Sequence, residues 1–237
     1  MGDTEQTAEQ PVPSTDACAP EHELTPEEAA FMGAVAFVGD VLSPFFLEDP
    51  RIGDAAPNYQ AMAALDPAAA AQEWPFTEPA EAEPALRMMV EGLAKGHEDY
   101  DLVVEYRRLF IGPAAKPCPP WGSVYTDREC VCFGLTCLDL RRWMRENGIA
   151  RLSDEHTPED HIGLMLALMA HVAIEKPEVL DDYLQNHLLT WSSHFLTQLE
   201  EAAKHPFYQG LARITRLSLE GIQEMREIKV TYPRFYR

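Results

Sequence analysis

The sequence of 237 residues predicts an all-α fold: a single globular, bundle-like domain of roughly ten helices. Three observations predict it. Apolar residues recur at spacings of three and four along many segments, and short connections rich in Pro, Gly, Asp and Ser separate those segments. No sustained stretch alternates apolar and polar residues as a half-buried strand would. The helical domain is expected over residues 25–237, after an acidic tail over residues 1–24 that is expected to be disordered.

The first predicted helix has the clearest start signal. Thr25 is the expected N-cap, Pro26 stands at the first helical position, and Glu28 completes a capping box. Ser43-Pro44 is expected to end this helix. The next helices are expected over residues 58–65, from Asp66-Pro67 to Trp74, from Pro84 to Gly96, and over residues 100–111.

The second half of the chain repeats these signals. Thr126 or Asp127 is expected to cap a long helix that stops at Asn147-Gly148. Thr157-Pro158 is expected to start the next helix, and Lys176-Pro177 to end it. Three further helices are expected over residues 179–189, 191–203 and 206–228, before an irregular aromatic segment that reaches Arg237.

The segment between the helix at 100–111 and the next one is unusually rigid. Four prolines stand between residues 113 and 120, and Trp121-Gly-Ser-Val-Tyr125 follows them. Proline fixes φ, so an aromatic side chain held on such a loop loses little entropy when it meets a partner. We interpret this loop as one wall of a recognition site. The alternative is that Trp121 packs into the core as a loop aromatic.

Charge and hydropathy restrict the class of partner. The net charge is −20, and residues 1–100 hold 20 acidic and only 3 basic side chains. Such a surface repels nucleic acid and anionic lipid and attracts cations, although solubility alone would also explain it. No segment is expected to be long and apolar enough to span a bilayer, and the first residues lack the features of a secretory signal. The expected location is the cytoplasm.

The usual chemical motifs are missing from the sequence. It contains no phosphate-binding glycine loop, no serine nucleophile elbow and no His-Glu-x-x-His, so we expect a binding protein rather than an enzyme. The odd number of cysteines argues against a disulfide framework. Cys130, Cys132 and Cys137 are interpreted as small buried apolar residues, with Cys130 and Cys137 on one helix face, in preference to a metal site. We therefore expect no cofactor and no metal.

Two groups of residues remain, 121–129 and 158–161, and together they resemble a known family. Pro-Pro-Trp-Gly-Ser-Val-Tyr125, Asp-Arg-Glu129, Phe133-Gly134 and Pro-Glu-Asp-His161 are similar to the signature motifs of TorD/DmsD/NarJ-type redox-enzyme maturation chaperones, most closely those of the DmsD branch. The likeness is dense over residues 100–210. One departure is Thr126, which replaces the leucine common after the tyrosine in many relatives.

The resemblance implies an all-helical cytoplasmic chaperone. It would bind the twin-arginine leader of a molybdopterin oxidoreductase precursor and delay Tat export until the cofactor is inserted, with Tat translocon components as further partners. The resemblance also implies the site residues. Leu109 and Phe110 would line the pocket, the first motif would contribute Pro120, Trp121, Gly122 and Tyr125, and the second Asp160 and His161.

The chemistry of such a leader fits an acidic helical protein. A twin-arginine leader offers two arginines followed by an apolar stretch, and a receptor needs carboxylates for the first and an aromatic groove for the second. Asp127, Glu129, Glu159 and Asp160 are the candidate arginine acceptors. Asp160 could instead cap its own helix, and His161 could be an ordinary residue of a helix face. The alternative functions are a nucleotide-binding or nucleotide-hydrolysing factor and a carrier of the molybdenum cofactor.

Overall fold

The computed structural model describes residues 24–52, 55–151 and 157–237, so nearly all of the expected acidic tail lies outside the described residues. Within these ranges the chain forms eleven α-helices, two π-helices, one 3-10 helix and no strand, which confirms the all-α class. The elements are α1 Pro26–Leu47, α2 Ala55–Ala63, α3 Pro67–Glu73, α4 Pro79–Gly92, α5 Tyr100–Tyr106, η1 Arg107–Ile111, α6 Ser123–Thr126, α7 Leu135–Glu146, α8 Ile162–Glu175, η2 Pro177–Val179, α9 Leu180–Tyr183, η3 Leu184–Leu188, α10 Ser192–Ala202 and α11 Pro206–Met225.

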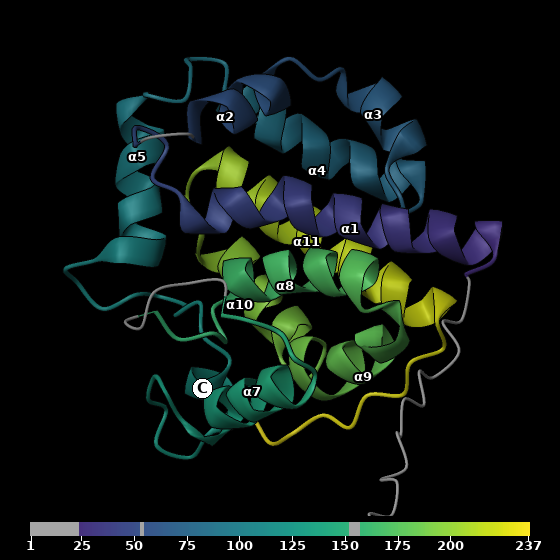
Figure 1. Ribbon diagram of the computed structural model, residues 1–237. Coiled ribbons are helices and arrows are strands. Elements are labelled where there is room, and N and C mark those ends of the chain that lie inside the picture. The colour runs from purple at the N-terminus through teal and green to yellow at the C-terminus, as the bar shows by residue number, and fades with distance from the viewer. Residues whose placement is uncertain (1–23, 53–54, 152–156) are drawn as a thin grey trace, which may run out of the picture.

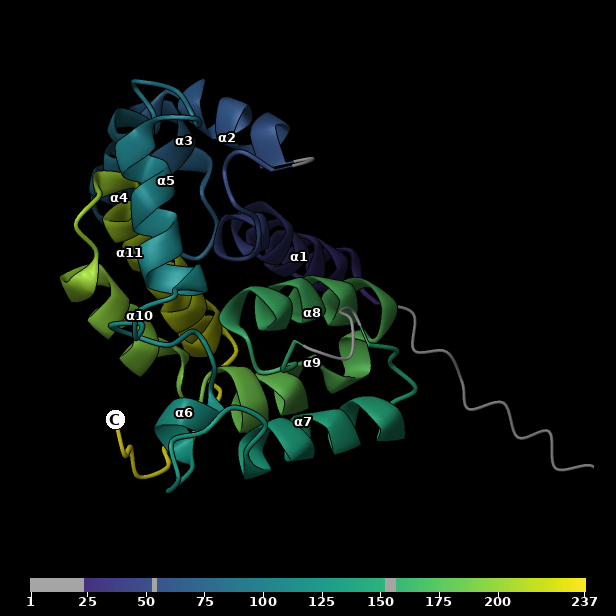
Figure 2. The ribbon, with the colours of Figure 1, turned by 90° about the vertical axis from the view of Figure 1, so that its left-hand side faces the viewer.

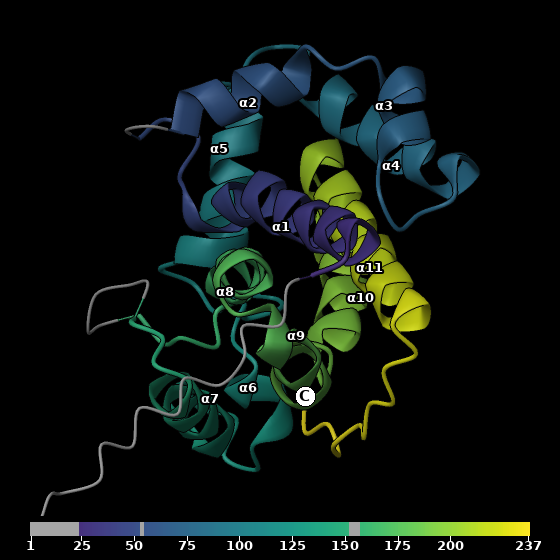
Figure 3. The ribbon, with the colours of Figure 1, turned by 45° about the vertical axis from the view of Figure 1, so that its right-hand side comes forward.

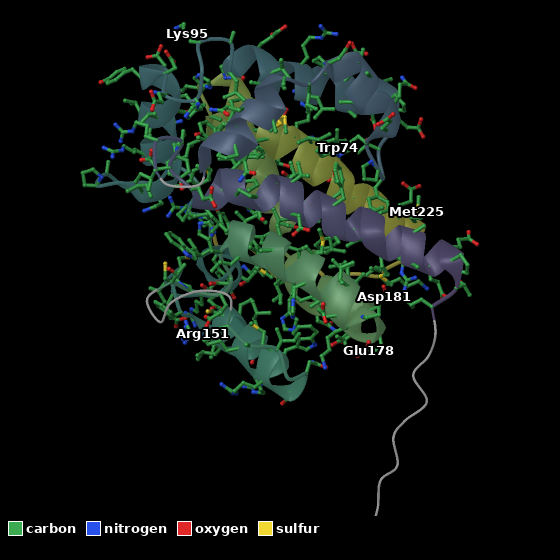
Figure 4. All side chains as sticks on the ribbon, turned by 45° about the horizontal axis from the view of Figure 1, so that its top comes forward. Trp74, Lys95, Arg151, Glu178, Asp181 and Met225 are labelled. Carbon is green, nitrogen blue, oxygen red and sulfur yellow. The ribbon has the colours of Figure 1, made fainter. Side chains whose placement is uncertain are left out.

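The long helix α1 runs through the middle of the molecule, with α2 to α4 on one side and α7 to α9 on the other (Figure 1). Its main partner is α8, which lies directly against it (Figure 3). Gly39 makes this approach possible, because a Cβ there would stand 2.4 Å from the Leu166 carbonyl oxygen. α11 packs on α4 and α10, and the Trp74 indole N–H donates to the Ser218 hydroxyl at 2.9 Å, which joins the end of α3 to α11 (Figure 4).

Two prolines proved weaker helix breakers than expected. α1 continues through Pro44 to Leu47, and α4 begins at Pro79, with Pro84 inside it. Each internal proline removes only one backbone hydrogen bond, and the carbonyl four residues earlier belongs to an exposed residue, so water can replace the lost donor. The two phenylalanines that follow Pro44 are buried in the core, and this packing favours the helical continuation.

Two helices begin later than their capping signals predicted. Residues 123–126 form only the single turn α6, and α7 begins at Leu135 with Gly134 as its N-cap, not at Thr126 or Asp127. α8 begins at Ile162 with His161 as its N-cap, so Thr157-Pro158 does not start it. In contrast, the capping box of Thr25 and Glu28 is present as predicted, and the stop at Asn147-Gly148 is confirmed by a φ of +66° at Gly148.

The expectation that no segment could span a bilayer was wrong by length and composition. α1 is 22 residues long with a hydropathy of 1.8 in its most apolar window, which is enough to cross a membrane on these two criteria. Half of that window is buried inside the protein, against α8 and other helices, as in the central helix of a helical core. Packing therefore accounts for the apolar sequence of α1.

Candidate functional site

The two sequence motifs meet in space. Trp121 and His161 form an isolated antiparallel bridge, in which the Gly122 N–H donates to the Asp160 carbonyl at 3.0 Å and the Ile162 N–H donates to the Pro120 carbonyl at 2.9 Å. The end of the proline loop and the start of α8 are therefore one unit, which we call the motif junction (residues 120–123 and 160–162). It lies between α6 and α8, with α7 next to α6 (Figure 2).

Asp160 holds the motif junction together from inside. Its carboxylate is almost completely buried, and Oδ2 accepts the Ser123 N–H at 2.7 Å, so it caps the first turn of α6 and not its own helix. Its other oxygen, Oδ1, has no hydrogen-bond partner among the described residues. Burial raises the pKa of Asp160, and the hydrogen bonds from Ser123 only partly oppose that shift. Asp160 is consequently a structural carboxylate of the site and not an open acceptor for arginine.

His161 is a buried helix cap. Its Nδ1 accepts the Gly163 N–H at 3.1 Å, and its ring meets the Trp121 ring edge-on at 5.7 Å between centroids. Burial lowers the pKa of His161 to about 3, with a smaller contribution from the nearby Lys116 ammonium. The imidazole is therefore neutral at physiological pH. His161 is the N-cap of α8 and not an ordinary residue of a helix face.

The depressed pKa of His161 predicts a pH dependence of stability. Because the folded-state pKa lies below the ordinary 6.5, the contribution to stability is present above pH 6.5 and is lost as pH falls toward 3, at up to about 1.4 kcal/mol per pH unit. His161→Asn keeps a capping acceptor and removes the titration. Urea unfolding at pH 5.0, 5.8, 6.5 and 7.5 should give a free energy that falls less steeply with acidification in this variant. Parallel curves for the variant and the wild type would contradict the assignment.

Trp121 and Tyr125, which the sequence placed together as contact residues, have different environments. Trp121 is partly exposed, and the Lys116 ammonium lies 5.3 Å from the centre of its ring. Tyr125 is completely buried and stacks on Trp191 at 6.0 Å. A Cβ at Gly122 would come within 2.7 Å of the Trp191 indole nitrogen, so the glycine lets the motif junction close onto Trp191. Of the two aromatics, only Trp121 offers a surface to a ligand.

Leu109 and Phe110 lie behind the surface. Both are buried in η1, and Phe110 packs edge-on against Phe46 and Tyr208, each at 5.9 Å. Pro120 is buried as well. These three side chains therefore belong to the core and offer no exposed surface to a ligand.

The candidate arginine acceptors are mostly occupied within the protein. The Asp127 carboxylate accepts the Thr136 hydroxyl at 2.8 Å and the Thr136 N–H at 3.3 Å. Glu159 forms ion pairs with Arg141 at 2.5 Å and Arg151 at 2.6 Å. Glu129 remains exposed. Asp127 and Glu159 therefore stabilise the segments around the motif junction, whereas Asp160 stabilises the junction itself.

The cysteine interpretation was only partly correct. Cys118 and Cys137 are buried, whereas Cys132 is exposed and Cys130 is intermediate. Cys130 and Cys137 do not share a helix face, because α7 begins after Cys130. Among residues 24–52, 55–151 and 157–237, no three His, Cys, Asp or Glu side chains are grouped so that they could hold a metal ion.

Sequence reasoning missed the role of the C-terminal segment at this site. The Tyr236 N–H donates to the Tyr125 carbonyl at 2.9 Å, and the Arg237 guanidinium donates to the Lys116 carbonyl at 3.1 Å. Phe235 stacks on His194 at 4.1 Å. The segment, recognised in the sequence only as irregular and aromatic, ends beside α6 and braces the proline loop (Figure 2). The aromatic residues of this segment were the sequence feature that could have indicated its packing against the site.

Comparisons with known proteins agree on one group of relatives. The family model described as nitrate reductase delta subunit matches residues 77–197. A probable Tat proofreading chaperone DmsD from Haemophilus influenzae is 42% identical over 70% of this chain and 80% of its own length. The Tat proofreading chaperone DmsD of Salmonella typhimurium is 39% identical over 85% of this chain and 95% of its own length. The chaperone protein TorD of Shewanella pealeana is 26% identical over 54% of this chain and 63% of its own length.

Proposed function

Because this chain belongs to the nitrate reductase delta subunit family, the TorD/NarJ/DmsD chaperones of molybdoenzyme maturation, we propose that its ligand is a twin-arginine leader. The leader would belong to the catalytic subunit of a dimethyl-sulfoxide-reductase-like enzyme. Binding in the cytoplasm holds this precursor back from Tat export until its cofactor is inserted. The protein acts by binding, without catalysis, and releases the precursor to components of the Tat translocon.

One observation carries this proposal: the two motifs form a single buried junction from which Trp121 emerges, partly exposed. A wall fixed by buried hydrogen bonds keeps its aromatic side chain in place, so little conformational entropy is lost on binding. An indole offers a large apolar area to a ligand, and its face attracts cations; at Trp121 the Lys116 ammonium already lies 5.3 Å from the centre of the ring. The Trp121 N–H is itself buried and has no partner among the described residues, so the part of the side chain that is open to a ligand is apolar.

The charge of the chain supports a cationic ligand. The net charge of −20 favours the approach of a leader that carries two arginines, and the attraction weakens with added salt. We infer that this long-range attraction, more than any single ion pair at the motif junction, accelerates association. Exposed ion pairs contribute only about 0.2–1 kcal/mol each.

Trp121→Ala is expected to weaken leader binding about tenfold or more, because the ligand loses its main apolar contact on the wall. Calorimetric titration with a synthetic twin-arginine leader measures the effect. Trp121→Phe should recover part of the affinity. Tyr100→Ala is the matched control, since Tyr100 is 76% exposed on α5. Unchanged affinity in Trp121→Ala, with its fold intact, would show that the leader binds elsewhere.

A further inference from the structure

Exposed apolar side chains gather on one short segment of the protein. Of the fourteen large hydrophobic residues that are exposed in the described ranges, four fall within eight consecutive positions, and the others are spread along the chain. We call these four the 131–138 patch: Val131, Phe133, Leu135 and Leu138, which are 50%, 41%, 71% and 45% exposed. A concentration of this kind on a protein surface marks a contact with a partner.

Hydrogen bonds and charged contacts fix the segment that carries the 131–138 patch, and this keeps its apolar side chains exposed. The carboxylate of Asp127 holds Thr136, in the first turn of α7, through two hydrogen bonds. On the other side the Arg141 guanidinium lies 5.0 Å from the centre of the Phe133 ring and also pairs with Glu159. Phe133 itself has a φ of +60°, a backbone conformation that is unfavourable for a bulky residue. These contacts hold the apolar side chains toward solvent when burial would otherwise be favoured.

The 131–138 patch is continuous with the motif junction. The Cys137 thiol donates to Glu159 at 3.6 Å, and Glu159 directly precedes Asp160. Cys132 stands between Val131 and Phe133; burial raises the pKa of its thiol, and the charges of Asp160 and Lys116 also act on it. The Lys116 ammonium in turn lies 5.3 Å from the centre of the Trp121 ring. A ligand seated on Trp121 therefore reaches the patch without crossing the molecule.

The charges around the 131–138 patch determine which part of a ligand fits there. On this stretch of chain the exposed basic residues Arg128, Arg142 and Arg145 are matched by the exposed acidic residues Glu129, Asp139 and Glu146, and Asp139 is paired with Arg142 at 3.0 Å. The exposed charges therefore balance here, on a chain whose net charge is −20, so this surface has no net attraction for the arginines of a ligand and suits an uncharged apolar segment. Leu135 and Leu138, three positions apart, share one face of α7, so they present a continuous surface to such a segment.

We propose that the 131–138 patch binds the uncharged apolar stretch that follows the two arginines of a twin-arginine leader, and so extends the site beyond Trp121. This inference rests on the proposed function. It assigns the two chemical parts of the leader to different surfaces: the apolar stretch lies on α7 and the loop before it, and the arginines lie outside the 131–138 patch.

The test uses the full chain, Leu135→Ser, Leu138→Ser and the double variant, titrated calorimetrically with two synthetic peptides. One peptide is a complete twin-arginine leader, and in the other the apolar stretch is replaced by Ser and Gly. The double variant is expected to bind the complete leader about tenfold more weakly and to bind the altered peptide as the wild type does. Ile174→Ser is the matched control, since Ile174 is 57% exposed near the C-terminal end of α8, whereas the motif junction lies at the start of that helix.

The failure of this inference differs from the failure of the proposed function. If the double variant binds the complete leader with wild-type affinity while Trp121→Ala loses it, the patch has another role and the leader site stands. If the wild type binds neither peptide, both proposals fail. Sedimentation of the variants and their retention by vesicles of anionic lipid complete the test. If leader affinity is unaltered, a change in sedimentation would show that the patch binds a second copy of this chain, and a change in vesicle retention would show that it binds a membrane surface. Either result would overturn the inference.

Discussion

Gly39→Ala is expected to lower the free energy of unfolding by about 3 kcal/mol, the upper end of the usual cost of overpacking a core. The new Cβ would stand 2.4 Å from the Leu166 carbonyl oxygen and 2.9 Å from the Ala170 Cβ. Neither neighbour is a flexible side chain, so α1 and α8 must move apart. Since α8 begins at the motif junction, the same shift is expected to weaken leader binding.

Gly33→Ala provides the control on the same helix. Gly33 is exposed and a Cβ there would meet no atom within 4 Å, so this variant should be more stable than the wild type by about 0.5–1 kcal/mol. Urea unfolding followed by circular dichroism measures both. Equal effects of the two substitutions would show that α1 and α8 do not pack as closely as described.

Asp160→Ala is expected to cost about 2 kcal/mol of stability, because the buried Ser123 N–H loses its acceptor and the motif junction loses one of its ties. Asp160→Asn should cost less, since the amide oxygen can still accept that hydrogen bond. Leader binding should fall in Asp160→Ala even at temperatures where the variant remains folded, because Trp121 loses its support. Full affinity in a folded Asp160→Ala protein would separate the stability of the junction from recognition.

The raised pKa of Asp160 adds a pH dependence to this comparison. Its folded-state pKa is above the ordinary 3.8, so the group contributes stability below that pH and the contribution is lost as pH rises through the folded-state value. The unfolding free energy of the wild type, relative to that of Asp160→Asn, should therefore fall as pH rises from 4 to 7. A constant difference over that range would mean that burial does not affect this carboxylate.

Local sequence signals predicted those elements whose ends depend on a few neighbouring residues. The capping box at Thr25 and the glycine stop at Gly148 are of this kind, and both are present. The predicted starts of α7 and α8 failed because a tertiary contact outweighed the local signal. Residues 158–161 look like a helix start, yet the backbone around Asp160 and His161 pairs with Pro120 and Gly122 instead.

The candidate site was predicted as a set of residues and not as a surface. The motifs around Trp121 and Asp160 do lie together, as the resemblance implied. Sequence could not distinguish the partly exposed Trp121 from the buried Tyr125, because that difference depends on Trp191, far along the chain. Nor could it show that Arg141 and Arg151 neutralise Glu159, since these pairs form only when Arg141 on α7 and Arg151, beyond the end of α7, come next to the segment before α8.

The position of Trp121 also gives the protein a built-in optical reporter. The chain has four tryptophans, and Trp74, Trp143 and Trp191 are only 6%, 8% and 1% exposed, whereas Trp121 is partly open to water. A ligand that covers the wall would shift the emission of this one indole to shorter wavelength and leave the other three nearly unchanged. The intrinsic fluorescence of the unlabelled protein would then follow occupancy of the site in real time, and Trp121→Phe would remove that signal.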